Sequence, residues 1–239
     1  MFKVAWFARF RQGMSGPDAR RHWAEIHGPL GKQVPGLEHY VQNHVIGPLP
    51  TLSGTSDERT QFDGYSCGWW TDSEAYNASL ETPEWARLGE DGHNVFDMAW
   101  FSHMSARVAE HPMIEGPMSP YKVVWVVRFK QGMDRRDGSR YWREVHGPIF
   151  KSLDIDRYVQ NHVVSSISSD AVADKIAKAG FDGFSECWFK DEAQFMRAIE
   201  SSTWAAAVED GLNVFDMSNL WGARLSERVI KSSPRLATL

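Results

Sequence analysis

The hexapeptide YVQNHV occurs twice in the chain, at 40–45 and at 158–163, and it carries groups that can exchange protons. Alternate side chains of a β-strand share one face, so Tyr40, Gln42 and His44 would form a row on one side of a strand. A neutral imidazole takes or gives a proton near physiological pH, and a phenol can donate to a developing oxyanion. The row therefore indicates acid–base chemistry that needs no metal or organic cofactor.

A second imidazole belongs to an HGP motif, which also occurs twice, at 27–29 and at 146–148. His27 follows Trp23 by four residues, so both lie on one face of the predicted helix, and the turn after it leads back toward the YVQNHV strand. We expect His27 to face the same cavity as that row. The predicted catalytic residues of the two copies are His27, Tyr40, His44, His146, Tyr158 and His162.

Each of these residues also has a purely structural interpretation, and the sequence leaves it open. A histidine in the last turn of a helix often bonds the final carbonyls. Tyr40 and His44 are equally consistent with a satisfied hydrogen-bond network between the two halves of the chain.

The chain holds 11 tryptophans, and most recur in both copies. Core packing explains most of them, yet some aromatic surface would line a remaining cavity and would favour a flat, apolar ligand. The predicted substrate-binding residues are Trp23, Cys67, Trp69, Trp142, Glu186 and Trp188.

Cys67 is the asymmetric member of this set, because Glu186 stands at the matching position of the second copy. A thiol beside Tyr40 and His44 would support an acid–base or nucleophilic role, although an unpaired strand cysteine usually acts as a small hydrophobe. We expect Cys67 and Cys187 to be free thiols. The chain has no CxxC motif and no His/Cys cluster, so no metal site is predicted.

Positioning of these groups follows from a tandem duplication. An offset of 119 residues aligns RFRQGM with RFKQGM, FDGYS with FDGFS, and NVFDM with its own copy. We predict a first repeat at 1–108, a Pro-rich linker at 109–120, a second repeat at 121–228 and a tail at 229–239.

Each repeat has the pattern βαββαβ. In the first copy the predicted elements are a strand at 3–11, a helix from Ser15 to His27, strands at 37–46 and 62–70, a helical region at 72–91 interrupted at Pro83, and a strand at 99–108. The predicted fold class is α+β, with two ferredoxin-like repeats that bury their exposed sheet faces against each other as an intramolecular pseudo-dimeric barrel.

Composition excludes several functions. The 239 residues are 42% hydrophobic and carry a net charge of −5 without a basic run, which excludes a nucleic-acid footprint. No uncharged stretch reaches the roughly 20 residues needed to span a bilayer. We therefore expect a soluble, cytoplasmic protein with no membrane or nucleic-acid partner, and a homodimer of the fused chain remains open.

The helix motif W-x-x-x-H-G-P, at 23–29 and 142–148, followed by a tyrosine-bearing strand, resembles the EthD-like branch of the dimeric α+β barrel superfamily. The resemblance spans about 2–108 and 121–228. It implies two sheets closed into a barrel, usually without metal or organic cofactor, with the acid–base histidine at His27 and His146 and the tyrosine at Tyr40 and Tyr158. Cys67 is similar to a strand cysteine of the methylmuconolactone methylisomerase branch, from which Glu186 departs.

Relatives implied by the resemblance include muconolactone-type isomerases, polyketide cyclases, and dehydratases or decarboxylases of aromatic compounds. We therefore predict a cofactor-independent lyase or isomerase that acts on a small aromatic, phenolic or lactone acid in a catabolic or secondary-metabolic pathway. The alternatives are a non-catalytic protein that binds an apolar metabolite or haem, and a cofactor-free monooxygenase.

Overall fold

The computed structural model describes residues 1–49, 61–167 and 179–233. In the first half the elements are β1 (Phe2–Ala8), α1 (Gly16–His22), η1 (Trp23–His27), α2 (Gly28–Lys32), β2 (His39–Gly47), β3 (Gly64–Trp70), α3 (Ser73–Leu80), α4 (Pro83–Val95), α5 (Met98–His103) and β4 (Ser105–Ile114). In the second half they are β5 (Tyr121–Val127), α6 (Arg135–Tyr141), η3 (Trp142–His146), α7 (Gly147–Ile149), η4 (Phe150–Ser152), β6 (Arg157–Ser166), β7 (Gly183–Phe189), α8 (Glu192–Ile199), α9 (Ser202–Gly211), η5 (Met217–Asn219) and β8 (Trp221–Lys231).

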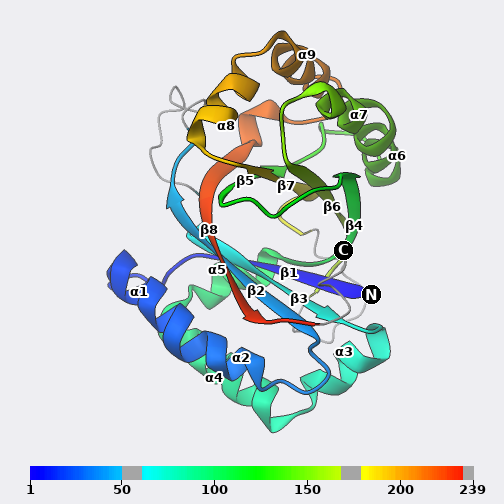
Figure 1. Cartoon of the computed structure of the whole chain (residues 1–239). Coiled ribbons are helices and arrows are strands. Elements are labelled where there is room, and N and C mark those ends of the chain that lie inside the picture. The colour runs from blue at the N-terminus through cyan, green and yellow to red at the C-terminus, as the bar shows by residue number, and fades with distance from the viewer. Residues whose placement is uncertain (50–60, 168–178, 234–239) are drawn as a thin grey trace.

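The strands form one closed, antiparallel barrel in the order β1-β3-β2-β8-β5-β7-β6-β4. The last strand of each half joins the two halves, since β4 pairs with β1 and with β6, and β8 pairs with β5 and with β2. The helices of the first half lie on one side of the barrel and those of the second half on the opposite side (Figure 1). Closure leaves no strand edge exposed between the halves.

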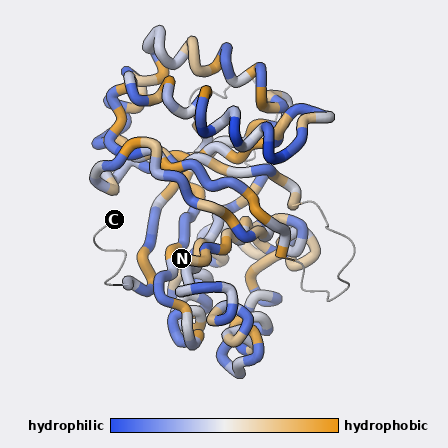
Figure 2. The backbone as a smooth tube through the Cα atoms, turned by 90° about the vertical axis from the view of Figure 1, so that its right-hand side faces the viewer, coloured by the Kyte–Doolittle hydropathy of each residue, from blue (hydrophilic) through white to orange (hydrophobic). Residues whose placement is uncertain are grey.

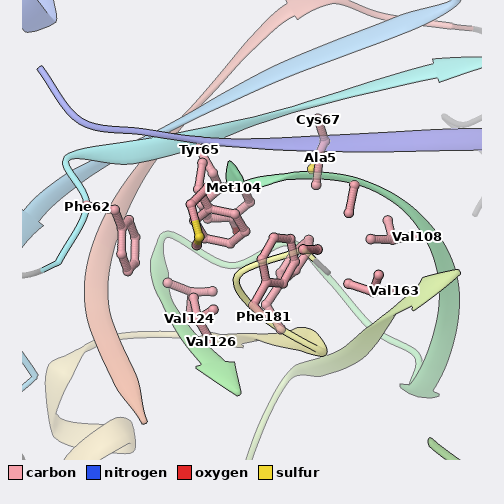
Figure 3. Close-up of a cluster of buried hydrophobic side chains, with 14 of the residues drawn as sticks. Ala5, Phe62, Tyr65, Cys67, Met104, Val108, Val124, Val126, Val163 and Phe181 are labelled. Atoms are coloured by element: carbon pink, nitrogen blue, oxygen red, sulfur yellow. The ribbon is translucent and has the colours of Figure 1, made fainter. Parts of the chain in front are cut away.

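Strand alternation sends one set of side chains into the barrel and the other toward the helices. The interior is filled by apolar groups from both halves, including Phe7, Tyr65 and Phe184, whose rings contact one another. Figure 3 shows Tyr65, Cys67 and Phe181 among these side chains inside the barrel. The opposite face of the strands is covered by the helices, and the predicted Tyr-Gln-His row lies on that face.

The repeated FDG sequence explains how the first helix of each half is seated. A Cβ atom on Gly183 would lie 2.5 Å from Cζ3 of Trp142 and 2.6 Å from the carbonyl oxygen of Asn161. Glycine is therefore required where the indole lies flat on β7. The preceding Asp182 accepts a hydrogen bond of 2.8 Å from the Phe129 backbone N–H, which fixes the chain at the start of the strand.

The first helix was predicted to end at His27, but it continues beyond that residue. It passes through a π-helical turn, Trp23–His27, and continues as α2, with Pro29 in the first turn of the new segment. A proline is tolerated there because its missing N–H is not needed in a first turn. Single π turns occur frequently at functional sites, and the second half repeats the turn at Trp142–His146.

Several boundaries also differ from expectation; β1 ends at Ala8 and not at 11, and α4 runs to Val95 and not to 91. A short helix, α5, occupies most of the stretch assigned to the start of the last strand, and β4 begins only at Ser105. β4 then runs to Ile114, so half of the expected linker is strand, and β8 runs to Lys231, into the expected tail. Both extensions pair with a strand of the other half. Analysis of one repeat alone cannot detect such pairing.

No helix in the described part of the chain is long and apolar enough to cross a membrane. Figure 2 shows hydrophobic and hydrophilic segments alternating along the tube, as expected for elements with one buried and one exposed face.

Candidate active site

Each half contains a buried histidine that is paired with an aspartate. Nδ1 of His27 lies 2.9 Å from Oδ2 of Asp91 on α4, and Nδ1 of His146 lies 2.8 Å from Oδ2 of Asp210 on α9. A carboxylate oxygen only accepts hydrogen bonds, so Nδ1 carries a proton, and in the neutral ring Nε2 then keeps its lone pair. This tautomer is the one in which Nε2 can act as a general base.

The second carboxylate oxygen of each aspartate is also held. Nε2 of His22 donates to Asp91 at 2.9 Å, and the hydroxyl of Tyr141 donates to Asp210 at 2.8 Å. Burial disfavours the charged form of Asp91, but the hydrogen bonds from His27 and His22 outweigh it and lower the pKa of Asp91 to about 2. A fixed anion behind the imidazole would stabilise the imidazolium that forms when the base takes a proton.

Burial lowers the pKa of His146, while Asp210 opposes that shift. The imidazole is therefore neutral at physiological pH, which is the protonation state that a general base requires.

Tyr158 presents a hydroxyl whose oxygen already accepts two hydrogen bonds. Nε2 of Gln160 donates to it at 2.9 Å, and Nε1 of Trp142 donates at 3.3 Å. Neither bond uses the phenol proton, which is left for an outside acceptor. Burial raises the pKa of Tyr158, so the hydroxyl stays protonated and can serve as a donor.

His162 fixes the orientation of Gln160. Its Nε2 lies 2.9 Å from Oε1 of Gln160, whose Nε2 in turn donates to the Trp142 carbonyl at 3.1 Å. Burial, followed by the charges of His111 and Arg143, lowers the pKa of His162 to about 3. The ring is therefore neutral, with its single proton on Nε2, and it directs the amide so that the NH₂ group points to Tyr158.

The first half repeats this relay with looser geometry. Gln42 donates to the Trp23 carbonyl at 2.9 Å and to the Tyr40 hydroxyl at 3.4 Å, and His44 lies 3.1 Å from Oε1 of Gln42. Burial, with Arg228 and Arg20, lowers the pKa of His44 to about 4. Nε1 of Trp23 is buried and has no hydrogen-bond partner among the described residues.

A cavity of about 80 Å³, partly open to solvent, lies between the sheet and the helices of the second half. Its lining brings together His146, Tyr158, Trp142 and Ser185. The remaining walls are almost entirely apolar and comprise Trp125, Val127, Phe150, Trp204, Ala207, Val208, Gly211, Phe215, Met217 and Leu220. The predicted histidine and tyrosine of this half therefore share one cavity.

His162 is not part of that lining. It lies behind Trp142, whose indole stacks on the imidazole with ring centres 4.3 Å apart. The equivalent pair, Trp23 and His44, has the same centroid distance. His162 is therefore placed to orient the relay, and His44 has the equivalent position in the first half.

Four of the predicted substrate-binding residues lie on the other face of the sheet, inside the barrel. Cys67 packs in the interior core, and burial raises the pKa of its thiol to about 12, so it is neither beside Tyr40 nor a thiolate. Trp69 and Trp188 stack against the ammonium groups of Lys3 and Lys122, and the fourth, Glu186, belongs to the same interior. The assignment of these four side chains to the histidine cavity was wrong because strand alternation places them one residue out of phase with it.

Glu186 is the centre of a buried ionic cluster. It lies 2.7 Å from Nζ of Lys122 and 3.6 Å from Nζ of Lys3, and it accepts from the Tyr65 hydroxyl at 2.6 Å. Burial alone would disfavour the charged carboxylate, but Lys122 and Lys3 outweigh it and lower the pKa of Glu186 to about 2. The asparagine of each YVQNHV copy serves this cluster, since Asn161 accepts from Lys3 at 2.7 Å.

Asp91 and Asp210 were not predicted from the sequence. Both occur in a repeated Glu-Asp-Gly stretch just before NVFDM, at 90–92 and 209–211. An acidic residue in the last turn and a half of a helix is usually solvated, and only its buried position against the first helix distinguishes it. The recurrence of the aspartate in both copies was the one available signal. Among the described residues, no group of three or more His, Cys, Asp or Glu side chains is arranged to hold a metal ion.

Comparison with known proteins gives one family and several solved structures. The EthD domain family matches residues 11–99 and again residues 130–218. An anthrone oxidase-like protein superposes with a TM-score of 0.60 at 8% identity, covering 98% of this chain and 95% of that chain. A protein named as a candidate monooxygenase from Lactobacillus acidophilus NCFM superposes with a TM-score of 0.52 at 9% identity. The match covers 97% of this chain and 96% of that chain. A candidate chlorite dismutase superposes with a TM-score of 0.51 at 11% identity, and the match covers 94% of each chain. At these identities the likeness is one of fold alone. No curated protein matches the chain.

Proposed function

Because the chain belongs to the EthD domain family, and because one of its two His–Asp pairs lines an apolar cavity, we propose that it is an acid–base enzyme of the lyase or isomerase type. The substrate is a small aromatic or phenolic compound bound in the second half, and the reaction needs no organic cofactor. The observation that carries the proposal is the presence of His146 and Tyr158 in one apolar cavity, with the His146 proton held on Nδ1 by Asp210.

In the proposed reaction, Nε2 of His146 takes a proton from an acidic C–H or O–H bond of the substrate. Asp210 keeps the Nδ1 proton in place and stabilises the imidazolium. The electron pair left on the substrate delocalises onto an oxygen, which accepts a hydrogen bond from Tyr158. His146 then returns the proton to a different atom in an isomerisation, or to a leaving group in a lyase reaction.

A second candidate shares the deprotonation step. The solved structures named as a monooxygenase and as an anthrone oxidase-like protein favour a cofactor-free oxygenation, in which the deprotonated carbon adds O₂. The O–O bond of the resulting hydroperoxide then breaks, the carbon becomes a carbonyl, and the second oxygen leaves as water. O₂ is the oxidant, and the role of His146 is unchanged.

A haem-binding role is supported less well by the cavity. His146 could act as an axial ligand. The two propionates of haem need cationic or strongly donating partners, and none of the described residues that line the cavity is Lys or Arg. The residues present therefore do not fit haem.

The architecture suggests how the site arose. We propose that the chain is a fused pseudo-dimer of a ferredoxin-like subunit. Two observations support this: the motifs recur at an offset of 119 residues, and the strand order β4-β1-β3-β2 of the first half recurs in the second half as β8-β5-β7-β6.

Anthrone, a flat neutral ketone with an acidic CH₂ group, provides a direct test. The protein is incubated with anthrone in D₂O, and deuterium incorporation is followed by mass spectrometry after subtraction of the buffer-catalysed rate. His146→Ala should slow the enzyme-dependent exchange by about 10² to 10⁴, the usual contribution of a general base. The control variant His93→Ala removes an exposed ring and should stay within about twofold of wild type. Equal exchange by wild type and His146→Ala would refute the proposal.

An oxygen electrode separates the two candidate reactions. A lyase or isomerase consumes no O₂ during exchange, whereas the oxygenation consumes one O₂ for each CH₂ group converted to a carbonyl, and it does so only when His146 is present.

A further inference from the structure

The second-half cavity has a chemical selectivity that narrows the substrate class. We propose that it binds a neutral, flat aromatic alcohol or ketone and discriminates against the carboxylic acid built on the same ring system. The inference rests on the proposed function only in taking this cavity as the substrate site, and it replaces the aromatic or lactone acid expected from the sequence.

The charge on the cavity wall is the first argument. Among the described residues that line the cavity, His146 and Tyr158 are the only ionisable side chains, and neither carries a positive charge at neutral pH. The carboxylate nearest to them, Asp210, lies directly behind His146 at 2.8 Å. A substrate carboxylate would lose its hydration without meeting a cation, and Asp210, on the far side of the imidazole, would repel it.

The hydrogen-bonding groups form the second argument. The free proton of Tyr158 can satisfy one substrate oxygen, because both hydrogen bonds recorded for that hydroxyl are accepted by its oxygen. Nε2 of His146 is an acceptor in its neutral form and suits an acidic C–H or O–H. One donor and one acceptor match a phenol or an enolisable ketone. Two carboxylate oxygens, each with several lone pairs, would remain largely unsatisfied.

The shape of the walls is the third argument. Phe150 packs against Tyr158 with ring centres 4.7 Å apart, and Trp204 meets the edge of Phe150 at 5.7 Å. Aromatic walls of this kind favour flat rings through stacked and edge-on contacts. On the α9 side the wall includes two small residues, Ala207 and Gly211, beside Trp204 and Val208, and the small residues leave space that the ligand would fill.

The first half supplies substitutions for testing this arrangement. Leu88 occupies the position equivalent to Ala207, so Ala207→Leu introduces a side chain that the same fold already accommodates. His93 occupies the position equivalent to Leu212, which is 53% exposed and does not line the cavity. Leu212→His is therefore a control of the same origin, one turn further along the chain.

The experiment uses 2-naphthol and 2-naphthoate as probes, titrated into the full chain at pH 7 and followed by calorimetry. We expect 2-naphthol to bind at least about tenfold more tightly than 2-naphthoate, a difference of about 1.4 kcal/mol. Ala207→Leu should weaken 2-naphthol binding by at least about tenfold, and Leu212→His should change it by less than twofold.

A charge added at the cavity wall tests the electrostatic argument separately. Val208 lines the cavity and is 44% exposed, so Val208→Lys can place an ammonium group there without burying it. This variant should strengthen 2-naphthoate binding by about tenfold or more and leave 2-naphthol binding within about threefold.

Three results would each overturn the inference. The wild type could bind 2-naphthoate as tightly as 2-naphthol, both probes could fail to bind, or Ala207→Leu could leave 2-naphthol binding unchanged. Failure of the proposed function looks different: selective 2-naphthol binding would be intact, but no deuterium exchange would depend on His146.

Discussion

Acidification from pH 7 to pH 5 should destabilise the folded chain by about 4 kcal/mol through His44 and His162 alone. Burial lowers the pKa of these histidines to about 4 and about 3, whereas an unfolded histidine titrates near 6.5. Below pH 6.5 each histidine therefore binds a proton in the unfolded state but not in the folded state. At pH 5 the difference is about 1.5 pH units, or about 2 kcal/mol for each ring at 1.36 kcal/mol per unit.

The sign of this effect follows from the direction of the two shifts. Because the folded pKa is lowered, the stabilisation is fully present above pH 6.5 and is lost as the pH falls below that value. The loss continues until the folded rings themselves take up protons, near pH 4 for His44 and near pH 3 for His162.

Urea unfolding followed by tryptophan fluorescence at pH 7, 6 and 5 measures this dependence. The variant His44→Gln/His162→Gln will differ from wild type in absolute stability, but its free energy of unfolding should fall by about 4 kcal/mol less over this pH range. His93→Gln, which removes an exposed ring, is the control and should leave the slope unchanged. A double variant as sensitive to acid as wild type would show that the two imidazoles are not held neutral by the fold.

Further outcomes follow from the other contacts. Gly183→Ala should cost at least about 2 kcal/mol in urea unfolding because its methyl group collides with the indole beneath it, whereas Gly89→Ala, with no atom within 4 Å of the new Cβ, should be neutral or stabilising by up to about 1 kcal/mol. Glu186→Gln should lower the free energy of unfolding by about 1 to 2 kcal/mol, because the two buried lysines lose their shared carboxylate but keep Glu110 and Glu227 as partners. Tyr158→Phe should reduce the rate of anthrone exchange by about 10²-fold while the protein stays folded. The exchange rate should fall to half of its plateau value only below pH 6.5, since burial lowers the pKa of His146; a midpoint above pH 6.5 would contradict this.

Much of the fold could be predicted from the sequence because the duplication supplies two readings of one pattern. The hexapeptide was placed on a strand with the correct alternation, and the strands at 39–47 and 64–70 lie within about two residues of expectation. The boundaries that failed depend on contacts between the halves, such as the pairing of 109–114 with β6. The continuation of the first helix through Pro29 depends on a π turn, which no local signal announces.

The candidate site was predicted in part for a similar reason. Types and spacing identified His146 and Tyr158, because an imidazole and a phenol are informative wherever they occur. The partner Asp210 was not singled out, and the glutamine of the row was given no role of its own, since both roles depend on which helix packs against which strand. Cys67 and Glu186 were assigned to the wrong face of the sheet. They pair with Val41 and Val159, the neighbours of Tyr40 and Tyr158, so their backbones lie close to the predicted row while their side chains point to the opposite face.

The carboxylate that Lys3 and Lys122 share, Glu186, has a consequence for how such a protein can evolve. In a dimer of identical subunits, any side chain near the symmetry axis faces its own copy, so the centre must contain two carboxylates or none. Fusion of the copies removes that restriction, and the chain has glutamate at 186 but cysteine at 67. An odd number of charges at the middle of a twofold arrangement is available only to a polypeptide whose halves are free to diverge.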